Sequence, residues 1–539
     1  MFKINPLYYS DGYKVGHKDM LAPGTQYLYG TWIPRSTKHA PGGITKIVSF
    51  GQQLVWKFIN DAFNEDFFYT KEREAYYHAD MSGSHEAYKF FDRKARKSEA
   101  LQFIKDMSLY LGLAYDGSHF EELWELGYLP IEVKALPEGV ETAPNIPHMT
   151  FVNTVPGYAW LTLYLETIVS SIAWKPATSA TIALQYRRNI TEWVMKTDPD
   201  NAFLIPFLAH DFSARGLSPW DMISSGLGHA TSFRGSDTLA VIPAARYYYN
   251  EPTSEVCINS VNASEHSVST TKIFTVGERQ MIIDWLKLLP EGIFSMVADT
   301  FSLWEFIEYL KDPEIKALVL SRNGKLVVRP DSGDPVDIIC GIDPENVEGA
   351  KEYEMIQNPQ PFHKGVIELL WDIFGGTTNA QGYKVLDPHI GAIYGDSINL
   401  DRQIQIYQRL EAKGFAATNI VLGVGSFTYQ MTTRDSMGYA AKGGWFQVLN
   451  EDGTTSDYNI YKDPVTDDGT KKSPKGLLQV QEVLEQVNSD GRLKHSHYVL
   501  KDQCTWEEEK QGALKTIFKD GKLVNETDLA TIRQRLNKL

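Results

Sequence analysis

Short apolar runs that each end in polar or glycine residues recur between about residues 203 and 426 of this 539-residue sequence. Helical patterns separate most of these runs, and we count about seven such units. Apolar strands that alternate with helices are typical of a parallel sheet, because crossover helices cover both of its faces. The number and spacing of the units favour a (β/α) barrel over an open sheet. The first strand of this series is expected at 203–208.

The regions before and after these units have mixed patterns of strands and helices. Strands are expected at 26–33, 129–136 and 149–153 in the first third, and at 444–449 and 497–500 near the end. Helices are expected at 50–63, 156–174 and 176–195, with a terminal helix from Asp528. The sequence therefore predicts an α/β protein with two domains. Residues 176–435 form the irregular (β/α) barrel, and residues 1–175 and 436–539 form an α+β domain built from both ends of the chain.

The run Leu326–Val328 is followed directly by Arg329-Pro-Asp-Ser-Gly-Asp-Pro, which brings a cation and a carboxylate to the end of a strand. Taken alone, this stretch is equally typical of a surface turn. Other predicted strands end in the same way, however, and ligands bind at the carboxyl ends of strands in α/β barrels. One face of the barrel is thus expected to collect Arg215, Asp237, His266, Asp299, Arg329, Asp331, Asp396 and Gly425.

The composition restricts the classes of partner. A net charge of −15 argues against non-specific binding to nucleic acid or to an anionic membrane surface, so a polyanionic ligand would need a local cluster of arginines and lysines. Three cysteines without a CxxC motif fit a reducing compartment and offer no metal framework. The first residues do not have the pattern of a signal peptide, and no apolar run reaches the ~20 residues of a membrane span. A cytoplasmic location is expected.

The residues collected on the barrel face indicate a phosphorylated substrate. Arginines such as Arg215, Arg329 and Arg434 bind phosphate with paired donors, and backbone amides of glycine turns at Gly395 and Gly425 bind further oxygens. Carboxylates there are suitable for Mg²⁺, which would keep most of its waters and bridge to phosphate. Walker A and HExxH motifs are absent from the sequence. His266 is either a general acid or base, a nucleophile, or a core histidine bonded to a carbonyl.

Nine motifs occur in the same order as in a known enzyme family, and together they are specific although each alone is weak. They are Asp11-Gly-Tyr-Lys, Leu129-Pro-Ile-Glu-Val-Lys-Ala, His210-Asp-Phe-x-x-Arg-Gly, Gly235-Ser-Asp-Thr, Ala263-x-Glu-His-Ser, Arg329-Pro-Asp-Ser-Gly-Asp-Pro, Gly395-Asp, Thr433-Arg-Asp and Lys462-Asp-Pro-Val. Over nearly its whole length the chain resembles the nicotinamide phosphoribosyltransferase family, a type II phosphoribosyltransferase group. The match is poor at residues 70–105, and Gly423-Val-Gly-Ser-Phe stands where the family has Gly-Ser-Gly-Gly-Gly.

The resemblance implies a glycosyltransferase that joins nicotinamide to 5-phosphoribosyl 1-pyrophosphate, giving nicotinamide mononucleotide and pyrophosphate in NAD salvage. It implies stimulation by ATP through a phosphohistidine, and Mg²⁺ held mainly through the diphosphate and water rather than by an assigned set of protein ligands. It also implies a homodimer whose active sites are shared between subunits.

The resemblance also assigns roles to residues of this sequence. It makes His266 the phosphorylated histidine, with Asp299, Asp331 and Glu265 as further catalytic residues. The nicotinamide would contact Phe212, Tyr13, Asp237, Arg329 and Asp11. Phosphate and ribose would contact Arg215, Gly395, Asp396, Gly425, Arg434, Lys442 and Lys471. Of these, Asp11, Tyr13, Arg434 and both lysines would serve the barrel of the neighbouring subunit.

Two alternatives remain open at this stage: a nicotinate phosphoribosyltransferase, and a non-catalytic protein that has kept the fold. Asp237 bears on the first, because a carboxylate that faces the ring substituent favours an amide and repels an acid. The second would be supported by loss of His266, Arg329 or Asp331, and all three are present.

Overall fold

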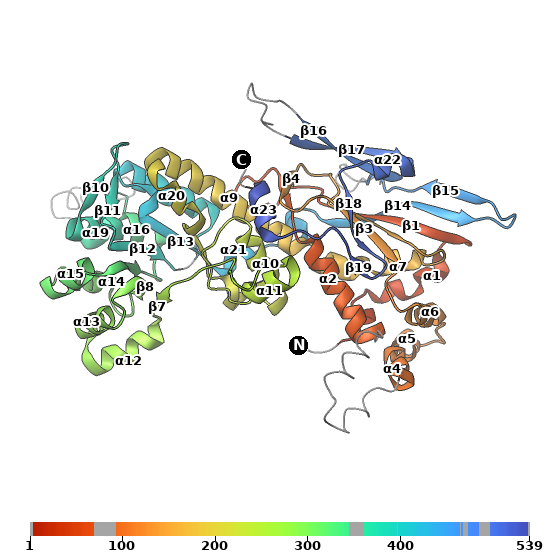
Figure 1. Cartoon of the computed structure of the whole chain (residues 1–539), viewed down its shortest axis with the longest axis horizontal. Helices are drawn as coiled ribbons and strands as arrows, with labels where there is room; N and C mark the ends of the chain where they lie inside the picture. Colours follow the sequence, from red (N-terminus) through yellow and green to blue (C-terminus); the bar gives the residue numbers. More distant parts are fainter. Residues whose placement is uncertain are drawn as a thin grey trace.

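The computed structural model describes residues 4–68, 93–343, 360–395, 397–463, 465–466, 473–484 and 496–536 (Figure 1). Two of the predicted site residues, Asp396 and Lys471, lie outside these ranges. Within them, no helix is both long enough and apolar enough to cross a membrane.

A seven-stranded sheet joins the two ends of the chain, with the strand order β15-β14-β1-β5-β3-β18-β19. The strands predicted at 26–33, 129–136, 149–153 and 444–449 are all confirmed here. β1 lies between β5 and β14, and it pairs antiparallel with both, for example Thr31 with Lys442. The bounds are β1 (Thr25–Ile33), β3 (Ile131–Ala135), β5 (Met149–Asn153), β14 (Ala440–Leu449), β15 (Thr455–Asn459), β18 (Lys515–Lys519) and β19 (Lys522–Leu523).

Both faces of this sheet are covered (Figure 1). Trp56 of α2 (Gln52–Phe63) packs against Phe151 and Phe518 on one face. On the other, Trp506 of α22 (Trp506–Lys510) meets Trp445 edge-on with ring centroids 5.1 Å apart. The predicted helix at 156–174 is divided at Leu165 into α7 (Ala159–Tyr164) and α8 (Glu166–Ile172), and the helix predicted at 176–195 is α9 (Trp174–Thr197).

A six-stranded, wholly parallel sheet forms the other part of the molecule, in the order β6-β13-β12-β9-β8-β7. Isolated parallel bridges continue it from Asp211 to Ser236 and from Gly235 to Asn259, so the sheet curls back toward β7. This confirms the predicted irregular (β/α) barrel. The bounds are β6 (Ala209–Asp211), β7 (Asn262–Ala263), β8 (Glu291–Val297), β9 (Asn323–Arg329), β12 (Ile390–Tyr394) and β13 (Ile420–Val424).

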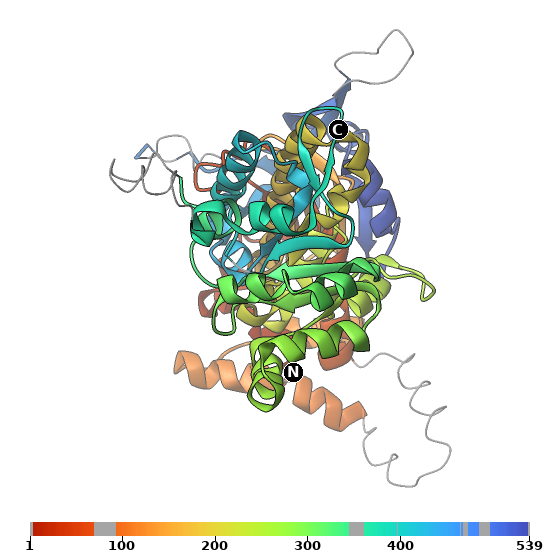
Figure 2. The same cartoon turned by 90° about the vertical axis from the view of Figure 1, so that its left-hand side faces the viewer.

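Helices pack on the outside of this curled sheet, as the view of this end of the molecule shows (Figure 2). Apolar residues of the strands and of most of these helices meet in one core, which explains the apolar runs in the strands, whereas those of the helices at 219–230 and 241–249 belong to a second core. The helices are α10 (Pro219–Ala230), α11 (Val241–Tyr249), α12 (His266–Val276), α13 (Glu278–Leu288), α14 (Leu303–Tyr309), α15 (Pro313–Leu320), α16 (Pro335–Cys340), α19 (Val366–Phe374), α20 (Leu400–Ala412) and α21 (Ser426–Gln430).

The strand predicted at 203–208 is wrong. Residues Pro199–Phe207 form a 3-10 helix, and the strand begins only at Ala209. Pro199 begins this helix, and Pro206 has no N–H with which to pair in a sheet.

The remaining elements are small. They are α1 (His17–Met20), α4 (Arg93–Ala100), α5 (Gln102–Leu111), α6 (Ser118–Leu126), α18 (Pro361–Lys364), α23 (Leu529–Leu536), and the paired strands β2 (Ile47–Ser49) with β4 (Val140–Thr142), β10 (Gly376–Thr378) with β11 (Lys384–Leu386), and β16 (Leu477–Leu484) with β17 (Ser496–Cys504). α23 confirms the predicted terminal helix, and β17 contains the strand expected at 497–500.

Candidate active site at the barrel mouth

The carboxyl ends of the parallel strands bring the predicted polar residues to one edge of the sheet. Backbone hydrogen bonds join these ends: the N–H of Ala298 donates to Arg329 (3.0 Å), that of Gly395 to Pro330 (3.2 Å), and that of Phe212 to Val424 (2.9 Å). We call this edge and the side chains on it the barrel mouth. It is defined by Phe212, Asp237, His266, Asp299, Arg329, Asp331 and Gly395.

His266 lies at the barrel mouth as the first residue of α12. Its Nδ1 is 3.3 Å from Oγ1 of Thr300, and its Nε2 is 3.8 Å from Asp299 and 3.7 Å from Asp331. Oδ2 of Asp299 accepts from the N–H of Asp331 at 2.9 Å, whereas its buried Oδ1 has no hydrogen-bond partner among the described residues. A partly exposed imidazole thus faces two carboxylates, one of which keeps an oxygen unsatisfied.

Arg329 provides a half-buried cation between these carboxylates and the rest of the mouth. One of its terminal nitrogens donates to the carbonyl of Ser264, and its buried Nε has no partner among the described residues. Burial lowers the pKa of the guanidinium, and the charges of Asp331, Asp237 and Asp299 oppose this effect. The unsatisfied Nε remains available as a donor to an anionic or carbonyl ligand.

Asp237, His210 and Phe212 form a contiguous group on the other side of Arg329. His210 Nε2 is 2.9 Å from Asp237 Oδ1, which also accepts from the hydroxyl of Ser260. The ring of His210 lies 4.5 Å from that of Phe212. Burial raises the pKa of Asp237, but the hydrogen bonds from His210 and Ser260 and the charge of Arg329 outweigh it, so this pKa lies below its usual value. The carboxylate is therefore ionised at neutral pH, beside an aromatic ring.

A buried aspartate holds the loop that carries Asp237. Oδ2 of Asp211 accepts from the hydroxyls of Ser236 (3.1 Å) and Thr238 (2.7 Å), and its Oδ1 accepts from the N–H of Ser213 (2.9 Å). These bonds fix the residues on both sides of Asp237 and also the turn that follows Phe212.

Two glycines allow the strand ends to approach closely. A Cβ on Gly395 would lie 2.4 Å from an oxygen of Asp331, and one on Gly423 would lie 2.3 Å from the carbonyl oxygen of Tyr394. A larger residue at Gly423 would require a backbone shift, and one at Gly395 would displace the side chain of Asp331. β13 ends at Val424 and α21 begins at Ser426, so Gly425 alone joins the strand to that helix.

Arg215 and Glu265 also lie at this edge but do not contact His266. Their side chains approach each other at 3.6 Å, and that of Arg215 is 92% exposed. Glu265 therefore faces the arginine, and the positions near the imidazole are occupied by Thr300, Asp299 and Asp331.

A second group of predicted site residues lies on the α+β part of the chain. Asp11 accepts from the hydroxyl of Thr167 at 2.7 Å, and Tyr13 is 69% exposed with its ring 5.4 Å from that of His17. Lys14 pairs with Glu166 at 2.7 Å. Burial lowers the pKa of Lys442. The charges of Arg35, Lys462 and Arg434 lower this pKa further, whereas the charge of Glu166 raises it. We call this the N-terminal cluster, defined by Asp11, Tyr13, Lys14, Glu166, Lys442 and Arg434.

The N-terminal cluster and the barrel mouth do not meet within one chain. α1, which directly follows the helical turn with Tyr13, lies at the opposite end of the molecule from α12, which begins at His266 (Figure 1). The phosphate and pyridine residues predicted from the sequence are therefore divided between two distant places.

Three contacts at the barrel mouth were not identified from the sequence: those of His210, Ser260 and Thr300. His210 is the first residue of the motif His210-Asp-Phe-x-x-Arg-Gly, and Thr300 follows the predicted site residue Asp299, but no role was assigned to either from the sequence. Ser260 lies in a loop, Ile258-Asn-Ser-Val-Asn, that has no distinguishing pattern.

The described residues contain no cluster of three or more histidine, cysteine or acidic side chains arranged to hold a metal ion. Asp299 and Asp331 nevertheless provide two neighbouring carboxylates, one with an unsatisfied oxygen. Such a pair fits Mg²⁺ that takes its other ligands from water and from a substrate diphosphate.

Comparison with known proteins identifies the family of the chain. Residues 207–519 match the model of the nicotinate phosphoribosyltransferase (NAPRTase) family. A nicotinamide phosphoribosyltransferase from Acinetobacter baylyi is 39% identical over 551 aligned positions, covering 99% of this chain and 97% of the relative. One from Xanthomonas campestris is 30% identical, covering 76% and 79%. A solved nicotinate-nucleotide pyrophosphorylase from Pyrococcus furiosus aligns at 12% identity with a TM-score of 0.49, covering 99% and 95%. The chain thus belongs to the nicotinate phosphoribosyltransferase family.

Proposed function

We propose that the protein transfers the phosphoribosyl group of 5-phosphoribosyl 1-pyrophosphate to nicotinamide, forming nicotinamide mononucleotide and pyrophosphate. The observation that supports the amide as substrate is Asp237, an ionised carboxylate near Arg329 that is joined to Phe212 through the ring of His210. Its free oxygen accepts from a carboxamide NH₂, and it repels the carboxylate of nicotinate. The relatives from Acinetobacter and Xanthomonas bear the name of this activity.

The reaction breaks the bond between the anomeric carbon and pyrophosphate and forms a bond from that carbon to the pyridine nitrogen. The transition state resembles an oxocarbenium ion, as in glycoside cleavage. No base is needed, because the pyridine nitrogen carries its own lone pair. The chain must hold the ring in line and stabilise the departing diphosphate. We assign the ring to Phe212, the carboxamide to Asp237 and Arg329, and the ribose hydroxyls to Asp331.

We further propose that His266 accepts a phosphoryl group from ATP. The bond between the β–γ bridging oxygen of ATP and its γ-phosphorus breaks, an N–P bond to the imidazole forms, and ADP leaves. Mg²⁺ near Asp299 and Asp331 would neutralise charge on the phosphates. The hydroxyl of Thr300, 3.3 Å from Nδ1, orients the ring so that Nε2 faces Asp299 and Asp331. The added negative charge then organises the metal and the diphosphate. We place this chemistry in cytoplasmic NAD salvage.

An assay of both pyridines tests the assignment. Purified protein with phosphoribosyl pyrophosphate and Mg²⁺ is expected to form the mononucleotide faster from nicotinamide than from nicotinate, and ATP is expected to increase the rate. Faster turnover of nicotinate would contradict the role of Asp237. Absence of turnover with either pyridine would favour a non-catalytic protein, and a rate independent of ATP would contradict the phosphohistidine.

We also propose a homodimer in which the N-terminal cluster of one subunit completes the barrel mouth of the other. The proposal is supported by the distance between the two groups in one chain and by the exposed ring of Tyr13. A second aromatic ring would then lie opposite Phe212 and enclose the pyridine.

Mixing two inactive variants tests this sharing of sites. In a heterodimer of Arg329→Ala and Tyr13→Ala subunits, one site has both mutations and the other has neither. Random reassociation should therefore restore about a quarter of wild-type activity. If Tyr13 serves its own subunit, the mixture will show only the sum of the two residual activities.

A further inference from the structure

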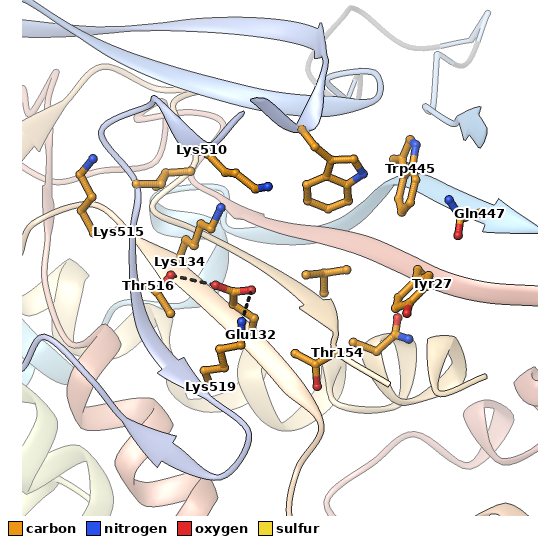
Figure 3. A pocket seen from close by; sticks show the side chains of 14 residues that line it. Tyr27, Glu132, Lys134, Thr154, Trp445, Gln447, Lys510, Lys515, Thr516 and Lys519 are labelled. Carbon is orange, nitrogen blue, oxygen red and sulfur yellow. Dashed lines mark hydrogen bonds and ion pairs between the residues drawn. The ribbon is translucent and has the colours of Figure 1, made fainter. Parts of the chain in front are cut away.

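A cavity lies on the seven-stranded sheet, and none of its lining residues belongs to the two groups described above. It has a volume of about 610 Å³, which is within the range of small-molecule sites. Its floor crosses five adjacent strands, β14, β1, β5, β3 and β18, and Trp506 and Lys510 of α22 also line it (Figure 3). Neighbouring strands are ~4.8 Å apart, so the floor extends for about 19 Å. We call this cavity the sheet trough.

The two ends of the sheet trough differ in chemistry. Tyr27, Trp445 and Trp506 line the end over β14 and β1. Four lysines line it over β3, β18 and the end of α22: Lys134, Lys510, Lys515 and Lys519. Figure 3 shows Tyr27 and Trp445 on one side of the cavity and these lysines on the other. Aromatic faces and a group of cations are thus separated along one continuous floor.

Only part of the positive charge is neutralised within the trough. Lys134 pairs with the buried Glu509, and Lys519 lies 3.3 Å from Glu132, which also accepts from the hydroxyl of Thr516. Lys515 donates to the carbonyl of Gly512 at 2.9 Å. Lys510 forms no ion pair or hydrogen bond with any other residue in the described part of the chain, and it points into the cavity (Figure 3). Uncompensated cations are thus concentrated here, although the chain as a whole carries a charge of −15.

The trough is not part of the barrel mouth or of the N-terminal cluster. No residue that lines the trough is among those that define the barrel mouth or the N-terminal cluster. None of the residues that line the trough belongs to the barrel strands. A ligand bound here would therefore not contact the residues assigned to the reaction.

We propose that the sheet trough binds a nucleoside phosphate as a site separate from the reaction centre. The base would pack against Tyr27 and Trp506, whose rings are partly exposed beside the buried Trp445, because flat rings stack on aromatic side chains with little sequence preference. The phosphate would lie among Lys134, Lys510 and Lys519, where ammonium groups form charge-assisted hydrogen bonds to its oxygens. A nucleotide has both chemistries joined by a ribose, which matches the order of the side chains along the floor.

Calorimetric titration with adenosine monophosphate tests this site, with Lys510→Glu as the variant. Lys510 is exposed on a short helix, so the substitution should not affect folding or basal turnover. We expect the variant to weaken binding by about tenfold or more. Lys522→Glu, an equal charge change at an exposed residue of β19 that does not line the trough, should leave binding within about twofold. Equal weakening by both variants would indicate only long-range charge and would overturn the proposal.

Two further measurements locate the ligand and separate its parts. Adenosine and inorganic phosphate alone should each bind about tenfold more weakly than the nucleotide, since each occupies one end of the trough. Hydrogen exchange should slow in β3, β14, β18 and α22 when the nucleotide binds. If protection is confined to α12 and the ends of β8 and β9, the nucleotide binds only at the barrel mouth and the proposal is wrong.

Discussion

Replacing Arg329 with alanine is expected to lower kcat/KM for nicotinamide by about 100- to 1000-fold, the cost of removing one preorganised charged donor from an active site. The guanidinium is half-buried, and its charge acts on Asp237, Asp299 and Asp331. Without it, three carboxylates remain in the mouth with no cation between them, and both the ring and the anionic substrate lose a partner. Steady-state kinetics with each substrate varied in turn will measure the loss.

The control for this substitution is Arg279→Ala on the outer surface of the barrel. Arg279 is partly exposed and pairs with Asp312 and Glu314 at the surface, where such ion pairs contribute little. The Arg279→Ala variant should therefore retain the wild-type kcat/KM for nicotinamide. If kcat/KM of Arg329→Ala is within about threefold of the wild-type value, Arg329 has no direct role in the reaction, because a preorganised donor contributes more than this.

The second large effect is expected on substrate choice. Asp237→Asn should reduce the preference for nicotinamide over nicotinate by about tenfold, since it removes a negative charge from a partly exposed position near the ring substituent. Asparagine has nearly the same shape and can still accept a hydrogen bond from the carboxamide. The preference should therefore fall mainly because the rate with nicotinate rises, and only to a smaller extent because the rate with nicotinamide falls. Competition between the two pyridines in one reaction measures the ratio directly.

Ser260→Ala serves as the companion variant, because it removes a hydrogen bond to Asp237 without changing the charge in the mouth. We expect it to lower kcat/KM for nicotinamide while leaving the discrimination against nicotinate in place. If Asp237→Asn leaves the ratio unchanged, the carboxylate does not face the ring, and the preference must arise elsewhere in the site.

Much of the barrel was predictable because its strands are continuous apolar runs between helical patterns. β9 is an example. Arg329 comes directly after the buried residues of this strand, so the strand prediction already placed the arginine at its carboxyl end. β6 was misplaced because Leu204 and Ile205 are apolar and suggested a strand, although the prolines on either side favour a 3-10 helix. Local composition did not distinguish these possibilities.

The candidate site was less predictable where a contact depends on the tertiary fold. Ser260 reaches Asp237 only because the loop before β7 runs beside the loop after β6. Lys510 follows three glutamates and has the local pattern of a solvated helix, yet the fold directs it into a cavity with lysines from β3 and β18. Periodicity reports which side of an element is buried, but it does not report which distant residue lies opposite.

The position of β1 between β5 and β14 has a consequence for synthesis of the chain. During translation β1 and β5 can pair early, but one edge of β1 stays open until more than four hundred further residues have been made, as the pairing of Thr31 with Lys442 shows. An open strand edge pairs readily with other chains, and contacts of long sequence separation form slowly. We expect nascent chains that stop before β14 to aggregate through β1, and full-length chains to depend on chaperones until the last hundred residues emerge.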